Sequence, residues 1–258
     1  LPKGEKFWET RDILDSADLP TVCSEARCPN IFECFSKKTA TFLAMGKVCT
    51  RACGFCDISH SKLPQALQND EPQRLAQSVI QLGLKHVVIT MVARDDLDDG
   101  GAAHLVLIIS EIRKQKKDVT IEVLTSDFSG NLSALSTVLK EKPEIFNHNL
   151  ETVRELTPRV RHKATYHRSL EVLKYARDFN PKPLVKSGIM VGLGETEEQV
   201  KAAIKDLHEV GCDIITIGQY LQASRHKLRV KTFIHPKQFK TYAEYGYSLG
   251  IKYVYSAP

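Results

Sequence analysis

Three cysteines lie within eight residues in the first quarter of the chain, where Cys49, Cys53 and Cys56 form a CX3CX2C spacing. Three thiolates in this arrangement can ligate three irons of a [4Fe–4S] cluster and leave the fourth iron open to a substrate or cofactor. A structural zinc site, by contrast, is normally closed by four ligands. The spacing therefore predicts an iron–sulfur centre that takes part in chemistry.

A second triplet with the spacing CX4CX5C precedes this run, and its members are Cys23, Cys28 and Cys34. A disulfide framework suits small secreted domains, whereas this chain has 258 residues, an odd total of seven cysteines and no signal-peptide-like apolar segment. Zinc stays open as an alternative, because His60, four residues after Cys56, could complete a tetrahedral site. The seventh cysteine, Cys212, precedes an apolar run and is expected to be buried and inert.

The CX3CX2C run resembles the signature of the radical S-adenosylmethionine (SAM) superfamily, and Phe55 matches the aromatic residue common inside that motif. The two triplets in this order resemble one family in particular, the lipoyl synthases, and the resemblance extends from about Lys6 to Pro258. It implies that the CX3CX2C cluster binds SAM and generates a 5′-deoxyadenosyl radical. It also implies that the other triplet holds an auxiliary [4Fe–4S] cluster, the sulfur donor.

The family's reaction inserts two sulfur atoms at C6 and C8 of a protein-bound octanoyl-lysine, so the resemblance implies a sulfurtransferase of lipoate biosynthesis and protein lipoylation. Unactivated C–H bonds offer no acidic proton, so no catalytic side chain is expected beyond the cluster ligands. A radical SAM sulfur-insertion enzyme of the biotin synthase type is the first alternative, although it would be expected to lack the CX4CX5C triplet. A zinc-stabilised binding module is the second.

Composition predicts an ordinary soluble globular protein with 42% apolar and 26% charged residues. Its most apolar stretches are too short for a membrane span, and a net charge of +5 is too weak a signal for nucleic acid. The resemblance implies an octanoylated lipoyl carrier domain (an E2 subunit or the glycine-cleavage H protein), an electron donor such as ferredoxin or flavodoxin, and a cluster-assembly carrier as partners.

Thiols and oxygen-sensitive iron predict a reducing compartment, the cytoplasm. Because the sequence begins with Leu1 and not Met, an organelle matrix stays open, if a transit peptide was removed.

Short β-branched runs alternate with segments of helical period after the cysteine-rich region, which predicts an α/β fold with a parallel sheet. We expect strands near residues 40–43, 86–92, 119–124, 145–149, 184–191, 214–219 and 253–255, and helices near 72–82, 102–114, 132–140, 166–179, 197–210 and 235–249. The resemblance implies a partial (β/α)6 radical-SAM barrel over 39–258, with a short C-terminal extension. Residues 1–38 are expected to form an N-terminal extension carrying the auxiliary-cluster cysteines.

The segment from Thr90 to Gly101 follows the second predicted strand and combines an acidic run with a glycine pair. Gly100 and Gly101 allow close approach of the backbone to a ligand, and Asp95 could receive an ammonium group. The segment resembles the part of the family that binds the amino group of SAM. The structural alternative is an acidic loop that caps the following helix.

Polar residues also follow the fourth predicted strand, where Asn149 and Glu151 are candidates to bind the sugar or amino-acid part of SAM. Helix capping is the alternative for both. His148 alternates to the other face and is expected to be a hydrogen-bonded core histidine. Gly192 lies in a glycine-rich turn that lacks P-loop residues and resembles the family segment whose backbone pairs with adenine.

Two features near the C-terminus complete the pattern. The run from Gly218 to Leu221 matches the family without a role that its residues explain. The basic residues that follow are Arg225, Lys227, Arg229 and Lys231, which predict either a solvated edge or a docking surface for an acidic carrier. The family's Arg-Ser-Ser-Tyr motif, whose serine ligates the auxiliary cluster, is absent before the last residue, Pro258, so the sequence names no fourth ligand.

Overall fold

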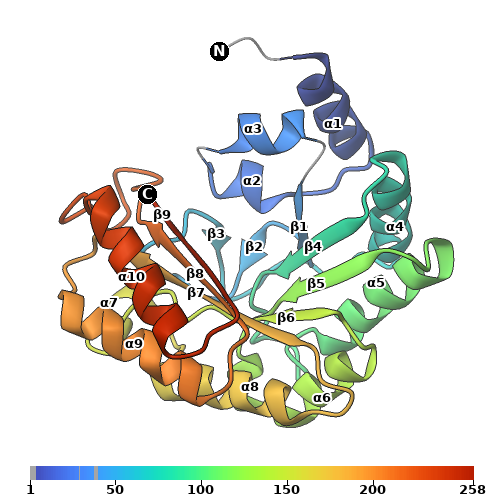
Figure 1. The fold of residues 1–258 in the computed structure, drawn as a ribbon. Coiled ribbons are helices and arrows are strands. Elements are labelled where there is room, and N and C mark those ends of the chain that lie inside the picture. Colours follow the sequence, from blue (N-terminus) through green and yellow to red (C-terminus); the bar gives the residue numbers. More distant parts are fainter. Residues whose placement is uncertain (1–3, 29, 38–39) are drawn as a thin grey trace. The chain divides into compact units, whose positions relative to one another are not determined.

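The computed structural model describes residues 4–28, 30–37 and 40–258, and Figure 1 shows its helices and strands. The chain divides into two compact units. The first unit runs to Arg51 and then from Asp57 to Glu144, and the second comprises Ala52–Cys56 and Ile145–Pro258. Neither division falls at residue 38, so the predicted boundary of an N-terminal extension stays a prediction. No helix in the described ranges is long and apolar enough to cross a bilayer.

The first unit contains three parallel strands of one sheet, a separate two-stranded pair and the helices around them. In chain order its elements are α1 (Glu5–Ser16), α2 (Val22–Glu25), α3 (Ile31–Ser36), β1 (Thr41–Ala44), β2 (Val48–Cys49), β3 (Ser59–His60), α4 (Glu71–Gln81), β4 (His86–Met91), α5 (Ala102–Gln115), β5 (Thr120–Leu124), the 3-10 turn η1 (Phe128–Gly130) and α6 (Leu132–Lys140). Thr90 of β4 pairs in register with Leu43 of β1 and Leu124 of β5. In the small parallel pair, Cys49 of β2 lies beside His60 of β3.

Helix α5 illustrates why these segments pack as they do. Leu105, Ile108, Ile109 and Ile112 recur at helical spacing, and each is at most 1% exposed. Burying such a side chain stabilises the fold by roughly 1.5–3 kcal/mol relative to leaving it in water. Basic residues end the helix, where they complement the carbonyl end of its dipole.

The region before the first strand is helical, which the sequence pattern did not lead us to predict. Phe7 of α1 and Phe35 of α3 are both buried, and their ring centroids lie 5.7 Å apart. Leu14, seven residues after Phe7, is buried on the same helix. The spacing of these apolar residues indicates a helix. We did not predict it, because most residues of α1 are polar.

The second unit contains four parallel strands in the order β6–β7–β8–β9, with α8 and α9 in the crossovers. Its elements are β6 (Ile145–Asn147), α7 (Thr157–Val160), α8 (Tyr166–Asp178), β7 (Leu184–Val191), α9 (Glu197–Glu209), β8 (Ile214–Gln219), α10 (Pro236–Ser248) and β9 (Tyr253–Ala257). The register pairs Val191 with Gln219, so β7 and β8 end together. A capping box between Thr196 and Gln199 begins α9.

The α/β class and the predicted order of strands and helices are confirmed in both units. Strand β6 is shorter than expected and ends at Asn147. Glu151 then adopts a left-handed backbone with φ 66° and pairs with Ile189 of β7 through an isolated bridge. A non-glycine residue in that conformation interrupts a regular strand, because its backbone turns away from the extended direction.

Candidate active site

The first cysteine of the CX3CX2C run is held by backbone amides of the first unit. The N–H groups of Arg51 and Ala93 donate to Cys49 Sγ at 3.4 and 3.3 Å. Thr50 ties the same two segments together, since its hydroxyl donates to the Ala93 carbonyl and accepts from the Asp95 N–H. Amide hydrogen bonds to a cysteine sulfur favour its thiolate form and are one means of setting a cluster's redox potential.

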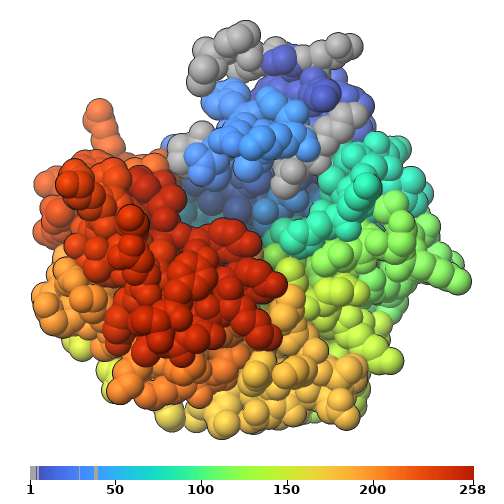
Figure 2. Space-filling model, in the orientation of Figure 1, coloured from blue at the N-terminus to red at the C-terminus, as the bar shows by residue number. Residues whose placement is uncertain are grey.

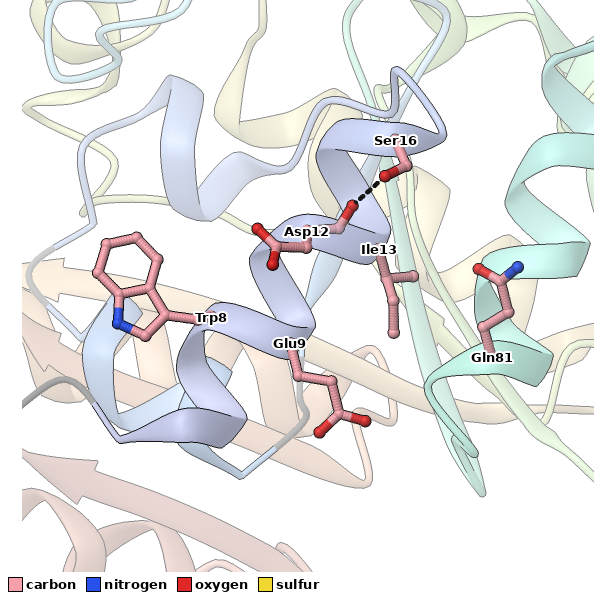
Figure 3. Close-up of a pocket in the computed structure, with 6 residues that line it drawn as sticks. All are labelled: Trp8, Glu9, Asp12, Ile13, Ser16 and Gln81. Carbon is pink, nitrogen blue, oxygen red and sulfur yellow. Dashed lines mark hydrogen bonds between the residues drawn. The ribbon is translucent and has the colours of Figure 1, made fainter.

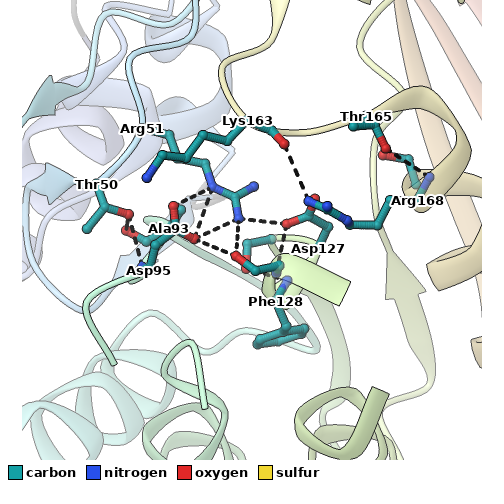
Figure 4. A network of polar contacts seen from close by, with 12 residues as sticks. Thr50, Arg51, Ala93, Asp95, Asp127, Phe128, Lys163, Thr165 and Arg168 are labelled. Carbon is teal, nitrogen blue, oxygen red and sulfur yellow. Dashed lines mark hydrogen bonds and ion pairs between the residues drawn. The ribbon is translucent and has the colours of Figure 1, made fainter. Parts of the chain in front are cut away.

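Arg51, inside the motif, is the centre of a buried ion-pair network (Figure 4). Its Nη2 lies 2.7 Å from Asp95 Oδ1 and 2.7 Å from Asp127 Oδ1. The Arg51 side chain is 5% exposed and that of Asp127 is 0% exposed. Burial alone would lower the pKa of Arg51, but the two carboxylates outweigh it and raise that pKa, so the guanidinium stays cationic. Sequence reasoning missed Arg51, although its position between two cysteines of the CX3CX2C motif was a signal.

The acidic run after β4 has structural partners in the first unit. Asp95, predicted to receive an ammonium group, accepts from both Nε and Nη2 of Arg51. Asp96 is paired with Arg94, whose hydrogen bond lowers the pKa of that carboxyl. Asp99 accepts from the N–H groups of Gly101 and Ala103 at 2.9 and 2.7 Å and so caps α5. For Asp99, the structure therefore supports the alternative that the acidic loop caps the following helix.

The remaining candidates of this segment lie next to these groups. Thr90 is buried near the carboxyl end of β4. Gly100 and Gly101 have φ values of 62° and 89°, and a Cβ on Gly101 would overlap the thioether of Met45. Both glycines thus have a conformational reason to be present, and their predicted contact with SAM stays a prediction.

The rest of the CX3CX2C run belongs to the second unit. The His162 N–H donates to Cys53 Sγ at 3.4 Å. Gly54 is held on both sides, since its N–H donates to Val160 O and its carbonyl accepts from Leu228 N, each at 2.9 Å. An added Cβ on Gly54 would lie 3.0 Å from Leu228 Cδ1, so the loop and residue 228 are in close contact.

Phe55 packs against an apolar cluster of the second unit. The fully enclosed members of that cluster are Val160, Leu193 and Tyr220. The aromatic ring therefore anchors the loop by burial, whatever the loop binds.

Asn149 and Glu151 lie together beside β7. Glu151 is half-buried, and its backbone N–H and carbonyl bond to Gly188 O and Met190 N, each at 2.9 Å. Burial raises the pKa of the Glu151 carboxyl, while the charge of Arg161 and a hydrogen bond from Asn149 oppose the rise. The backbone of Glu151 is left-handed, and residues with strained backbones of this kind are often found at ligand sites.

Gly192 and Gln219 join the ends of β7 and β8 to a later segment. Gly192 O accepts from Lys231 N at 2.8 Å, and Gly192 N donates to the Glu195 carboxylate. A Cβ on Gly192 would lie 2.5 Å from Thr232 O, so only glycine fits there. Since both backbone groups of Gly192 are used within the chain, adenine pairing at this residue stays a prediction.

The auxiliary triplet is gathered by α2, α3 and the turn between them, where Cys28 N donates to Cys23 O at 3.0 Å. Burial raises the pKa of Cys23 and of Cys34, and Cys28 is near enough to raise both further. Cys23 and Cys28 line a cavity of about 430 Å³ together with Arg11, Arg27 and Lys47 among others. The structure thus brings the auxiliary triplet together beside a cavity that is lined by charged side chains of both signs, since Asp15 and Glu25 line it as well.

Three further observations bear on the candidates. A shallower hollow of about 740 Å³ is lined by Trp8, Glu9, Asp12, Ile13 and Ser16 of α1 and by Gln81 of α4 (Figure 3), and none of the predicted site residues lines it. His148 is 1% exposed and bonded to Ser169 Oγ at 3.0 Å, which confirms its structural role. Cys212 is 5% exposed, and burial raises its pKa, as expected of an inert thiol.

The chain matches the Radical SAM superfamily over residues 43–207. A lipoyl synthase of Protochlamydia amoebophila is 62% identical to it over 100% of this chain and 80% of that relative. A lipoyl synthase of Caldicellulosiruptor saccharolyticus is 50% identical over 100% of this chain and 90% of the relative. The chain belongs to the lipoyl synthase family. As such it is a radical SAM, sulfur-inserting enzyme that uses SAM and [4Fe–4S] clusters.

Solved structures agree on the fold. Streptococcus suis SuiB bound to S-adenosylmethionine aligns with a TM-score of 0.64 at 13% identity, covering 90% of this chain and 55% of SuiB. HydG, a maturase of the [FeFe]-hydrogenase, aligns with a TM-score of 0.61 at 15% identity, covering 96% of this chain and 68% of HydG. Lipoyl synthase membership sets aside the biotin-synthase-type and zinc-module alternatives.

The cysteines fit the clusters that this family uses. No disulfide involves any of the seven cysteines, and two of the CX3CX2C sulfurs already accept backbone N–H groups. In the described part of the chain, no three His, Cys, Asp or Glu residues are placed to hold a single metal ion. A [4Fe–4S] cluster makes a different demand, because each thiolate binds its own iron and the thiolates stand farther apart.

Proposed function

We propose that this enzyme inserts two sulfur atoms at C6 and C8 of an octanoyl-lysine presented by a lipoyl carrier domain. The observation that carries the proposal is the pair of cysteine triplets in a chain 62% identical to a lipoyl synthase. One triplet alone accounts for radical chemistry but not for a sulfur source. A ferredoxin or flavodoxin supplies electrons in this proposal, a cluster-assembly carrier restores the auxiliary cluster, and the reaction takes place in the cytoplasm.

Each triplet has its own task in this proposal. Cys49, Cys53 and Cys56 hold the cluster that binds SAM, and Cys23, Cys28 and Cys34 hold the cluster that gives up sulfur. When bound, the clusters and SAM supply the radical chemistry and the sulfur atoms that side chains cannot provide. The protein's residues bind, orient and shield these groups, and backbone N–H groups donate hydrogen bonds to the sulfurs of Cys49 and Cys53.

The cations around the auxiliary triplet fit the assignment of a cluster to it. Arg11, Arg27 and Lys47 line the cavity beside Cys23 and Cys28. Three thiolates and a cluster core of about +2 leave a net charge near −1, which nearby cations offset. Arg27 and Lys47 are oriented by Asp57 and Glu25, at 3.3 and 3.7 Å.

The SAM contacts are assigned to residues near the strand ends. Glu151 receives the ammonium group or the ribose hydroxyls, and Asn149 orients its carboxylate. Gly192 is assigned to the adenine part of SAM on the family resemblance, and Thr90, Asp95, Gly100 and Gly101 complete the assignment on the first unit. Asp95 then acts through Arg51, which it holds in place.

The test combines metal analysis with product formation. Anaerobically reconstituted protein should contain about eight irons and eight labile sulfides per chain and convert an octanoyl-lysyl peptide to a thiolated product in one turnover. Cys28→Ala should keep SAM cleavage and lose sulfur insertion, whereas Cys53→Ala should lose both. Cys212→Ala, which removes a buried thiol outside both triplets, is the matched control and should retain both activities. A Cys28→Ala protein that still makes thiolated product would refute the assignment.

A further inference from the structure

One segment carries the positive charge of this protein. Residues 221–240, the basic segment, contain six lysines and arginines and no carboxylate: Arg225, Lys227, Arg229, Lys231, Lys237 and Lys240. The whole chain has 36 Lys and Arg against 31 Asp and Glu, a net charge of +5, so without these six the remainder carries −1. The net positive charge is thus concentrated in one segment of the chain.

The basic segment is exposed and its cations are available. Arg225, Arg229 and Lys237 are exposed, and no carboxylate in the described part of the chain forms an ion pair with any of the three. Two apolar side chains stand out on the same segment, with Phe233 73% and Leu221 48% exposed. Figure 2 shows residues after β8, orange to red, on the surface. Exposed apolar groups among unpaired cations are typical of a docking surface with electrostatic selectivity.

The backbone of this segment is held in one conformation by the residues that end β8. Tyr220 Oη donates to Leu228 O at 2.8 Å. The Gln219 side-chain amide donates to Thr232 O at 3.2 Å and accepts from Ile234 N at 2.9 Å. A surface fixed in this way loses little conformational entropy when a partner binds. These bonds also explain why Gln219 ends β8 and Tyr220 follows it, which the sequence alone did not.

The basic segment lies at the reactive end of the second unit. It follows the carboxyl end of β8, the side of a parallel sheet where α/β active sites open. Its Leu228 donates a backbone hydrogen bond to Gly54, inside the CX3CX2C run. The basic segment is therefore in direct contact with the CX3CX2C loop.

We propose that the basic segment docks an acidic carrier domain that presents the octanoyl-lysine. Its cations face carboxylates of the carrier, and Phe233 and Leu221 supply the apolar contact. This inference rests on the proposed function, because it assigns the partner of the same site. An isolated octanoyl-lysyl peptide has too few carboxylates to use the surface, so the two substrates separate docking from chemistry.

The test uses the triple variant Arg225→Gln, Arg229→Gln, Lys237→Gln in the reconstituted holoenzyme. Single-turnover rates at subsaturating substrate are measured with dithionite as reductant, on an octanoylated acidic carrier domain and on an octanoyl-lysyl peptide. At low ionic strength we expect the rate constant to fall about tenfold on the carrier domain and to be unchanged on the peptide. The difference should shrink at about 0.5 M salt, because exposed charges are screened.

The matched control removes three positive charges elsewhere, with Lys114→Gln, Lys117→Gln and Lys205→Gln, and should leave both rates unchanged. Unchanged carrier rates in the triple variant, or equal losses on carrier and peptide, would overturn the docking proposal alone. A loss that occurs only when a flavodoxin replaces dithionite would overturn it in favour of an electron-donor surface. Wild-type protein that thiolates neither substrate would overturn the proposed function and the docking together.

Discussion

Replacing Arg51 by methionine tests whether the buried ion pairs hold the CX3CX2C loop. Methionine replaces the aliphatic part of the arginine side chain and lacks the guanidinium, so Asp127, which is 0% exposed, keeps a buried carboxylate without that partner. Asp95, 15% exposed, loses the same partner. Breaking a buried pair in this way costs roughly 3–5 kcal/mol, because the remaining carboxylate loses its guanidinium partner in a site with little access to water.

This magnitude can be measured. For 258 residues an unfolding entropy of roughly 2.1 cal/mol/K per residue converts the loss into a fall in Tm of about 6–9 °C. Urea unfolding of the metal-free Arg51→Met protein, followed by circular dichroism, should show the same free-energy loss. The double variant Arg51→Met/Asp127→Asn should recover about 1–3 kcal/mol, since the uncompensated charge is removed.

The control is an exposed pair of similar type. Lys174 and Asp178 lie 3.1 Å apart with side chains 65% and 62% exposed, and Lys174→Met should cost less than about 1 kcal/mol. A second measurement is the iron content of the reconstituted Arg51→Met protein. Loss of the ion pairs should disorder the CX3CX2C segment and lower the iron content from about eight to about four per chain. An Arg51→Met loss below about 1 kcal/mol, or a double variant no more stable than the single one, would refute the reasoning.

Three further predictions concern the second unit. Burial opposes ionisation of Asp213, but hydrogen bonds from Lys252 and the Val185 N–H and the charge of Arg177 lower its pKa overall. The ionised Asp213 therefore stabilises the fold above about pH 4, and this stabilisation is lost as pH falls further. Asp213→Asn should lose roughly 2–4 kcal/mol at pH 7, with the difference from wild type shrinking in acid unfolding experiments. Glu151→Gln should weaken SAM binding about tenfold or more, as measured by calorimetry. The wild-type protein should lose affinity for SAM as pH falls through the raised pKa of Glu151, and the affinity of the variant should not change over that pH range. Gly192→Ala should lower stability by roughly 2–4 kcal/mol, because φ is 100° and the new Cβ meets Thr232 O. Gly218→Ala, where a Cβ meets nothing within 4 Å, should cost less than about 1 kcal/mol in the same assay.

Local patterns decided what could be predicted from the sequence. The bounds of β7 and β8 and the burial of Cys212 depend on neighbouring residues in the chain, and all are confirmed. The cysteine spacings are local as well, because three ligands of one cluster can be supplied by a single short loop. Chemistry carried by a short motif can therefore be predicted from the order of residues alone.

Long-range partners were decided only by the tertiary structure. Arg51 pairs with Asp95 and Asp127, 44 and 76 residues later, and no periodicity links these positions. The same holds for Gln219, whose amide reaches Thr232, and for Leu228, which contacts Gly54 from 174 residues away. The spacing of residues in the sequence predicts which side chains of one loop can bind the same ligand. Which distant charges neutralise one another depends on strands brought side by side, since electrostatic and hydrogen-bond energies depend on distance in space.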